Sequence, residues 1–460
     1  MKNKYHQVVI HIKQQIQDKS LKPGSKAPSI REICEIFGCN KATAIRAYEE
    51  LQKEHVIFSV PKSGFYVVER DTEPKRQDDS VIDFLTACPD EELLPYQEFQ
   101  HSINQAIKVY KDHMFSYSDV QGLPTLRKVM KDHLRDSQIF CGIDQIFITS
   151  GSQQALYILS KMSFPNGKRN VLIEQPTYYG MIKALELNQI TAIGIERKAD
   201  GYDMDRLESI FRSNDIKFFY MIPRFHNPTS FSLQADQRKQ ILKLAQKYDV
   251  YIIEDDYLAE LETNSKMDPM FAMEPSNRVA YIKSFSKTLL PGLRLGVAVL
   301  PQLLINSFYS HKACCDLLTN TLSQGALEIY LKSGMYDNHL KHIRSFYCDQ
   351  MKTLKNAIEG EPTLKNCGSV PETGFFVCLE LPENIRARAL EEALKMKKVY
   401  LTSIDRVFLP GFEKSNLIRL CVCRVKKQQI HRGIRLLAEV LEKETGDTCT
   451  LKQTNVNSFF

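Results

Sequence analysis

Short β-rich runs alternate with helical stretches between about residue 145 and residue 300, and this alternation constrains the fold more than any other feature of the chain. The clearest helical stretch covers residues 233–248. Strands separated by helices are joined by crossover connections, which favour a mainly parallel sheet covered by helices. We therefore predict an α/β fold with strands at residues 145–149, 171–174, 190–195, 218–222, 250–254, 279–284 and 295–300.

The chain of 460 residues is long enough for two or three domains. No apolar run approaches the roughly 20 residues that span a bilayer, and the first residues are amphipathic, so we expect a soluble cytoplasmic protein without a membrane partner. The twelve cysteines include no CxxC and no Cys/His cluster at zinc spacing, so we expect no metal site. A redox or metal role for the close groups, Cys314-Cys315 and Cys421/Cys423, is the alternative to small buried side chains.

The first 68 residues predict three short helices and a β-hairpin. Ser29 and Glu32 form a capping box at the start of the second helix, and Asn40 caps the third, which runs to about Lys53. The side chains expected to face the core recur at helical spacing: Tyr5, Val9, Ile12 and Ile16, then Ile30, Ile33, Ile36 and Phe37, then Ala44, Tyr48 and Leu51. This pattern predicts a winged helix-turn-helix, whose third helix enters the major groove of double-stranded DNA.

Positive charge is concentrated in this N-terminal region. Residues 1–70 hold 12 lysines and arginines and 7 acidic residues, an excess of +5, which leaves about +1 of the net charge of +6 for the rest. A basic head on a nearly neutral body indicates a polyanionic partner. A solvated basic face on a protein-binding module is the alternative. The residues predicted to contact a DNA operator are Ser29, Arg31, Lys41, Thr43, Arg46, Lys62 and Gly64.

Residues 69–80 are almost wholly charged or polar and cannot bury a core, so we predict a flexible linker. The predicted domains are therefore residues 1–68 for the head and 81–447 for the body. Within the body we expect a smaller α+β subdomain from about residue 330 to residue 447.

Polar residues follow several predicted strands of the body, where parallel α/β sheets bind ligands. The turn that starts at Ser150-Gly151-Ser152-Gln153 opens a helix, and such helix N-termini bind anions. The strand at 250–254 ends in Asp255-Asp256-Tyr257, which could hold a protonated ring nitrogen. The strand at 279–284 leads into Ser284-Phe285-Ser286-Lys287 and then Arg294, which together predict a phosphate cradle with a built-in amine. A lysine desolvated at such a site can attack an aldehyde.

The head resembles the GntR-type DNA-binding domain. The resemblance rests on Pro28-Ser29-Ile30-Arg31 and on Ala47-Tyr48-Glu49-Glu50-Leu51. His55-Val56 departs from the glycine that usually precedes the wing in that family, which affects one turn.

Residues 81–445 resemble a fold-type I pyridoxal 5'-phosphate (PLP) aminotransferase domain through a series of ordered motifs. The run from Ser284 to Gly296 is similar to the PLP-lysine signature, which implies that Lys287 carries the cofactor as a Schiff base. The resemblance implies phosphate contacts from Ser284, Ser286, Arg294, Ser152 and Gln153. It implies Asp255 on the ring nitrogen, Tyr257 and Asn227 on the phenolic oxygen, and Tyr178 on the ring face. It also implies Arg419 as the grip for an amino-acid carboxylate, and Tyr117 as a phosphate contact in the neighbouring subunit of a homodimer.

The two parts together resemble the MocR/GabR regulators, in which a GntR-like head is fused to an aminotransferase-like body. The resemblance implies a PLP-dependent transcriptional regulator. Our hypothesis is that an amino acid or amine displaces Lys287 as an external aldimine, that the small subdomain closes, and that the DNA-binding heads move. Two alternatives stay open: a catalytically active PLP-dependent aminotransferase that carries a DNA-binding domain, and a sensor of PLP itself. Ser230 departs from the glycine usual after Asn-Pro-Thr, which could alter that turn.

Overall fold

The computed structural model describes residues 4–18, 20–54, 56–60, 63–68, 80–263, 267–274 and 276–456. The chain divides into two compact units, residues 1–79 and residues 80–460, which are considered separately below. The predicted wing-tip residue Lys62 and linker residues 69–79 lie outside the described residues. None of the described helices is both long and apolar enough to cross a membrane.

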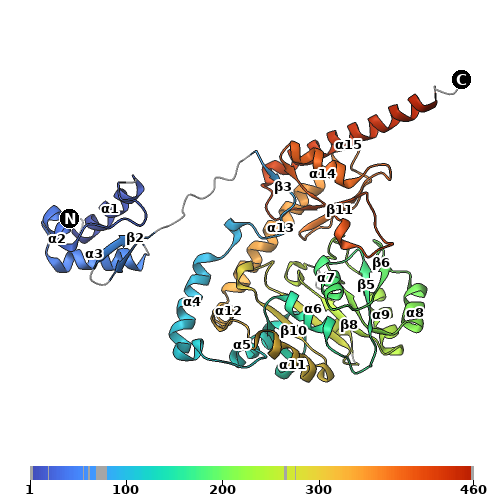
Figure 1. Ribbon diagram of the computed structural model, residues 1–460, viewed down its shortest axis with the longest axis horizontal. Helices are drawn as coiled ribbons and strands as arrows, with labels where there is room; N and C mark the ends of the chain where they lie inside the picture. Colours follow the sequence, from blue (N-terminus) through green and yellow to red (C-terminus); the bar gives the residue numbers. More distant parts are fainter. Residues whose placement is uncertain are drawn as a thin grey trace. The chain divides into compact units, whose positions relative to one another are not determined.

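The N-terminal unit is a three-helix head with a two-stranded wing (Figure 1). Ser29 and Glu32 form the predicted capping box, and Asn40 caps the third helix by accepting from the Thr43 amide. Ala44, Tyr48 and Leu51 are fully buried, as the helical spacing predicts. The elements are α1 (Lys4–Gln17), α2 (Ile30–Phe37), α3 (Lys41–Lys53), β1 (Ile57–Val60) and β2 (Gly64–Val67).

The prediction for Ile36 was wrong, because its side chain is 60% exposed. On an α-helix Ile30 and Phe37 lie on one side of the buried Ile33, whereas Ile36 lies on the other. The apolar stripe of α2 is therefore narrower than its composition indicates.

The C-terminal unit is built around a seven-stranded sheet in the order β4-β10-β9-β8-β7-β5-β6. All strands run parallel except β10, which is antiparallel to β4 and β9. Every strand lies within two residues of its predicted range: β4 (Ile146–Thr149), β5 (Asn170–Gln175), β6 (Ala192–Glu196), β7 (Ile216–Met221), β8 (Tyr251–Asp255), β9 (Val279–Ser284) and β10 (Gly296–Val299). The strands β7, β8 and β9 are wholly buried, as expected for a sheet with both faces covered.

Helices surround this sheet, and the long helix α13 leads into the smaller subdomain (Figure 1). The helices before and beside the sheet are α4 (Tyr96–Tyr110), α5 (Pro124–Asp136), α6 (Ser152–Lys161), α7 (Tyr179–Leu187), α8 (Met204–Ser213), α9 (Ala235–Lys247), α10 (Met270–Met273), α11 (Ile305–Asp316) and α12 (Thr321–Lys332). The smaller subdomain holds α13 (Met335–Glu359), β11 (Phe376–Glu380), α14 (Ala387–Met396), β12 (Val399–Tyr400), β13 (Thr402–Ser403), β14 (Leu417–Cys421) and α15 (Lys427–Val456).

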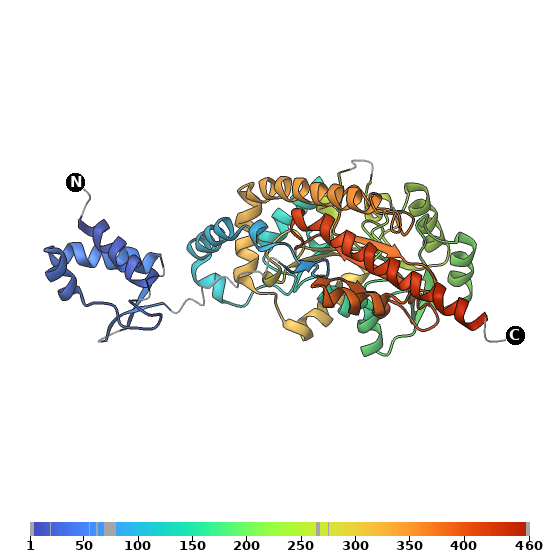
Figure 2. The ribbon, with the colours of Figure 1, turned by 90° about the horizontal axis from the view of Figure 1, so that it is seen from above.

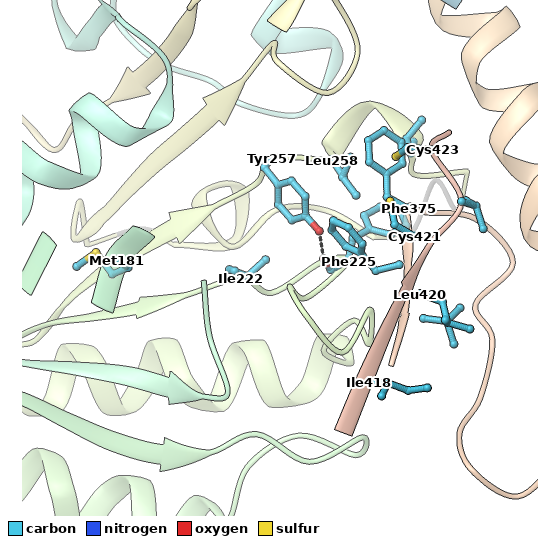
Figure 3. Close-up of a cluster of buried hydrophobic side chains, with 14 of the residues drawn as sticks. Met181, Ile222, Phe225, Tyr257, Leu258, Phe375, Ile418, Leu420, Cys421 and Cys423 are labelled. Carbon is cyan, nitrogen blue, oxygen red and sulfur yellow. Dashed lines mark hydrogen bonds between the residues drawn. The ribbon is translucent and has the colours of Figure 1, made fainter. Parts of the chain in front are cut away.

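The smaller subdomain also recruits the start of the body. Strand β3 (Ile82–Asp83) pairs with β12, far along the chain, and α13 and α15 lie side by side (Figure 2). One hydrophobic core extends from one face of the sheet into this subdomain, and Figure 3 shows part of it, with Cys421 and Cys423 near Phe375. Both cysteines are fully buried. The subdomain is therefore packed against the sheet and does not stand apart from it.

Candidate functional site

A cavity of about 260 Å³ brings together almost all of the predicted cofactor and effector residues. Its predicted lining residues are Ser152, Gln153, Tyr178, Asn227, Asp255, Tyr257, Ser284, Ser286, Lys287, Arg294 and Arg419. Ala87, Ile222 and Phe376 complete the wall. A larger cavity of about 520 Å³ is lined by other side chains, including Gln175 and Thr229, and holds none of the predicted site residues that the structure describes.

The topology of the sheet explains why these residues meet. Parallel strands present their carboxyl ends at one edge, so the segments that follow β4, β5, β7, β8 and β9 converge there. Arg294 belongs to the segment before β10, but β10 is antiparallel, so its start lies at the same edge. Arg419 comes from β14 of the smaller subdomain. The cavity thus lies between the sheet and that subdomain.

Asp255 is the most perturbed carboxylate at this site. Burial raises its pKa to about 7, and the nearby Asp256 and Glu174 act in the same direction, while a hydrogen bond from Tyr220 opposes them. The Tyr220 hydroxyl donates to Asp255 Oδ2 at 2.8 Å. Asp255 Oδ1 is buried and has no hydrogen-bond partner among the described residues. A buried acceptor without a donor is costly, so this oxygen is suited to a donor supplied by a ligand.

Hydroxyl, amide and guanidinium groups gather at another part of the cavity. The Ser286 amide donates to Ser284 Oγ at 3.2 Å, and Arg294 Nη1 donates to Ser286 Oγ at 3.4 Å. Ser152 is the first residue of α6, where free backbone amides favour an anion. Gly151 has φ +79°, and a Cβ there would lie 2.7 Å from Arg294 Nη2. A glycine is therefore required for this arginine to approach the helix end.

Lys287 follows β9, and its amine donates to the backbone oxygen of Ala87. Ala87 lies in the segment at the start of the second unit, which begins at Ser80. The same segment is tied to the smaller subdomain, because the Phe84 amide donates to Tyr400 O at 2.8 Å and the Cys421 amide to Phe84 O at 2.8 Å. Residues 80–87 thus contact both the lysine and the smaller subdomain.

The remaining wall combines aromatic and polar groups. Arg419 Nη1 donates to Asn227 Oδ1 at 3.3 Å, and its guanidinium carbon lies 4.5 Å from the centre of the Phe376 ring. The Tyr257 hydroxyl donates to Phe225 O at 2.8 Å (Figure 3). The Tyr178 hydroxyl donates to Gln153 Oε1 at 2.9 Å. Burial raises the pKa of Tyr178, with Asp255 adding to the rise and Arg294 opposing it.

Tyr117, which is predicted to contact the phosphate of a neighbouring subunit, does not line the cavity of its own chain and is 87% exposed. Four residues of the site were missed by sequence reasoning, namely Ala87, Tyr220, Ile222 and Phe376. Tyr220 could have been found, since it precedes the end of β7, next to the strand that carries Asp255. Ala87 offers only a backbone oxygen, and no side-chain pattern identifies such a contact.

The predicted DNA-contacting residues of the head divide into two groups. Arg31, Lys41 and Arg46 are exposed, although Arg31 Nε lies 3.3 Å from Glu35 and Arg46 lies over the Tyr5 ring. Three others also shape the fold: Ser29 caps α2, Thr43 donates to Asn40, and Gly64 adopts φ +121° at the start of β2.

Comparison with known proteins matches both units. The model for aminotransferase class I and II matches residues 93–437, and the model for bacterial regulatory proteins of the gntR family matches residues 4–67. The chain is 42% identical over 438 residues to the uncharacterized HTH-type transcriptional regulator YcxD of Bacillus subtilis, covering 94% of this chain and 99% of that one. The chain belongs to the MocR/GabR-type transcriptional regulators. Such a regulator joins a GntR helix-turn-helix domain to an aminotransferase domain.

Other matches agree with this family. The HTH-type transcriptional regulator YdcR of Escherichia coli is 27% identical, over 96% of this chain and 99% of that one. Solved aminotransferase structures resemble the body of this MocR/GabR-type regulator. The kynurenine aminotransferase of Pyrococcus horikoshii has a TM-score of 0.74 at 27% identity, over 79% of this chain and 91% of that one. The α-aminoadipate aminotransferase LysN of Thermus thermophilus, complexed with N-(5'-phosphopyridoxyl)-L-leucine, has a TM-score of 0.72 at 26% identity, over 80% and 93%.

Proposed function

We propose that this protein is a PLP-dependent transcriptional regulator whose aminotransferase-like body senses an amino acid or amine and repositions its DNA-binding heads. The observation that carries the proposal is the cavity in which Lys287, Asp255, the Ser284/Ser286/Arg294 group and Arg419 meet. The related LysN was solved with a phosphopyridoxyl-amino-acid in place.

The residues present fit PLP. Asp255 Oδ1 is a buried acceptor in need of a donor, and a protonated pyridine nitrogen would supply one. Ser284, Ser286 and Arg294 supply donors for a phosphate, and the start of α6 adds backbone amides. PLP, when bound, supplies an aldehyde that condenses with primary amines.

Each residue then has a defined task. The Lys287 amine is the nucleophile for the aldehyde, and Asp255 holds the proton on the ring nitrogen. Asn227 and Tyr257 lie at the wall where a phenolic oxygen would be held. Tyr178 would cover the ring face, and Gln153 would contact the phosphate together with Ser152. Arg419 pairs with the carboxylate of an amino acid through two hydrogen bonds.

Residues 80–87 would transmit a change at Lys287 towards the DNA-binding head. When an effector amine takes the place of Lys287, the lysine amine is free to donate to Ala87 O. Since Ala87 lies close after the linker and its segment pairs with the smaller subdomain, its position depends on the state of the lysine. An effector shifts this equilibrium only by binding the two states unequally.

A homodimer forms part of the proposal. Val109, Phe115 and Tyr117 expose apolar surface on and after α4, which a second copy would cover while Tyr117 reaches the phosphate of that copy. Sedimentation of the protein, with and without a Tyr117→Ala substitution, tests this arrangement.

The central experiment compares Lys287→Ala with Lys352→Ala, since Lys352 is an exposed lysine of α13. After incubation with PLP, borohydride reduction and peptide mass spectrometry should place the cofactor on Lys287 in the unchanged protein and in Lys352→Ala. Lys287→Ala should lack the covalent adduct and the absorbance band of the imine between lysine and cofactor. Amino acids should also have no effect on its binding to duplexes selected from a random pool, as measured by a gel-shift assay. A covalent cofactor elsewhere, or no binding to duplex at low salt, would refute the proposal.

An active aminotransferase is the second candidate, supported by the aminotransferases among the solved structures that resemble the body. Incubation with amino acids would then convert PLP to pyridoxamine phosphate with many turnovers when a keto acid is added. A sensor of PLP alone is the third, and in that case DNA binding would respond to PLP and ignore amino acids.

A further inference from the structure

Ser230 joins the sheet side of the cavity to the smaller subdomain. It lies in the loop between β7 and α9, is only 6% exposed, and donates its hydroxyl to the backbone oxygen of Phe376 in β11. Its φ is +66°, a left-handed conformation that costs a serine more than a glycine. Such conformations persist where the surrounding contacts over-determine them.

The loop that carries Ser230 is tightly braced. The Ser230 amide donates to His226 O at 2.5 Å, the His226 amide to Phe231 O at 3.2 Å, and the Phe225 amide to Ser232 Oγ at 3.0 Å. Tyr257 holds Phe225 from the side of the sheet (Figure 3). These hydrogen bonds restrain the loop, so a contact from the loop can hold another element in position.

Among the described residues, two hydrogen bonds connect this loop to the smaller subdomain. Asn227 accepts from Arg419 of β14, and Ser230 donates to Phe376 of β11. These two strands pair directly, with Cys378 opposite Arg419, and the Phe376 ring supports the Arg419 guanidinium. The first bond involves a guanidinium that a carboxylate would engage, whereas the second uses no group that touches an effector.

We propose that Ser230 is a positioning residue: its hydroxyl bonds β11 to the loop, a contact called the latch below, and thereby sets the position of Arg419 for the carboxylate of an amino acid. The latch keeps the smaller subdomain in place against the sheet while Arg419 gives up its hydrogen bond to Asn227 and binds an incoming ligand. The statement about amino acids rests on the proposed function, whereas the statement about the latch does not.

Ser230→Ala and Ser230→Gly form a matched pair for testing the latch in the full chain. Both remove the hydroxyl, but only glycine relieves the left-handed conformation, so Ser230→Gly should melt at a higher temperature than Ser230→Ala. If the hydroxyl is the latch, hydrogen exchange of β11 and β14 in the cofactor-free protein should rise equally in both variants, relative to the central strand β8. Exchange that stays unchanged, or that follows the order of melting temperatures, would overturn the proposal.

The effect on ligands is measured with two probes that differ in their carboxylate. The PLP-loaded proteins are titrated with L-alanine and with methylamine, and the change in absorbance is followed. Both variants should bind L-alanine about fivefold more weakly, the factor expected for one net hydrogen bond, and methylamine as before. Equal weakening for both probes, or for neither, contradicts the positioning of Arg419. A failure to take up PLP would count against the proposed function, while the exchange result would still decide the latch.

Discussion

Replacement of Asp255 by asparagine should stabilise the cofactor-free protein at alkaline pH. Burial raises the pKa of Asp255 to about 7 from an ordinary value of 3.8. At pH values between these two pKa values, the Asp255 carboxyl is ionised in the unfolded chain and still protonated in the folded chain. The free energy of unfolding therefore falls by about 1.4 kcal/mol for each pH unit in this window and levels off above pH 7, a total of about 4 kcal/mol.

Asparagine has a similar shape, can still accept from Tyr220, and carries no charge that burial could penalise. The asparagine does not titrate, so the comparison of two pH values isolates the titration of Asp255. From pH 5 to pH 8 the free energy of unfolding of the variant should rise by roughly 3 kcal/mol relative to that of the unchanged protein, because the unchanged protein loses stability over the two pH units from 5 to 7.

Urea unfolding followed by far-UV circular dichroism measures this difference, since the chain contains no tryptophan. Asp256→Asn is the matched control: Asp256 is equally buried but lies 3.1 Å from Arg224 Nε, so its loss should destabilise the protein by about 4 kcal/mol. Asp255→Asn should also weaken PLP binding roughly tenfold to hundredfold, through loss of a charged hydrogen bond. A difference between Asp255→Asn and the unchanged protein that is the same at pH 5 and pH 8 would refute the reasoning.

Three further substitutions test other parts of the molecule. Arg419→Met should weaken L-alanine binding roughly 100-fold and leave methylamine unaffected, as read by titration of the PLP-loaded protein; equal losses would contradict its carboxylate role. Gly151→Ala should cost about 2 kcal/mol in urea unfolding and weaken PLP binding by displacing Arg294, whereas Gly167→Ala, with open space around its Cβ, should leave PLP binding intact. Arg31→Ala should lower DNA affinity and make the slope of log affinity against log salt concentration shallower by about one, with no change in melting temperature. An unchanged slope would show that Arg31 is not part of the DNA interface.

Local patterns predicted the elements of the head and the strands of the large sheet, because such patterns reflect burial within one segment. The strands from β4 to β10 were recovered from runs of apolar residues, and the caps at Ser29 and Asn40 from short polar motifs. The antiparallel direction of β10 was not predictable, because an apolar run has no signal for its direction in a sheet. Ile36 was misplaced because the composition of a helix does not show how wide its contact with neighbours will be.

The sequence by itself determined the chemical groups of the site and their order: a carboxylate at Asp255 and an amine at Lys287, each at or just after a predicted strand, and a guanidinium at Arg419. Only the tertiary structure decided how these groups meet their surroundings. The contact of Lys287 with Ala87 and the bond from Ser230 to Phe376 join segments far apart in the chain, and the oxygen Asp255 Oδ1 is buried without a partner among the described residues. Backbone oxygens and burial depth depend on packing across the whole domain, and no short stretch of residues encodes them.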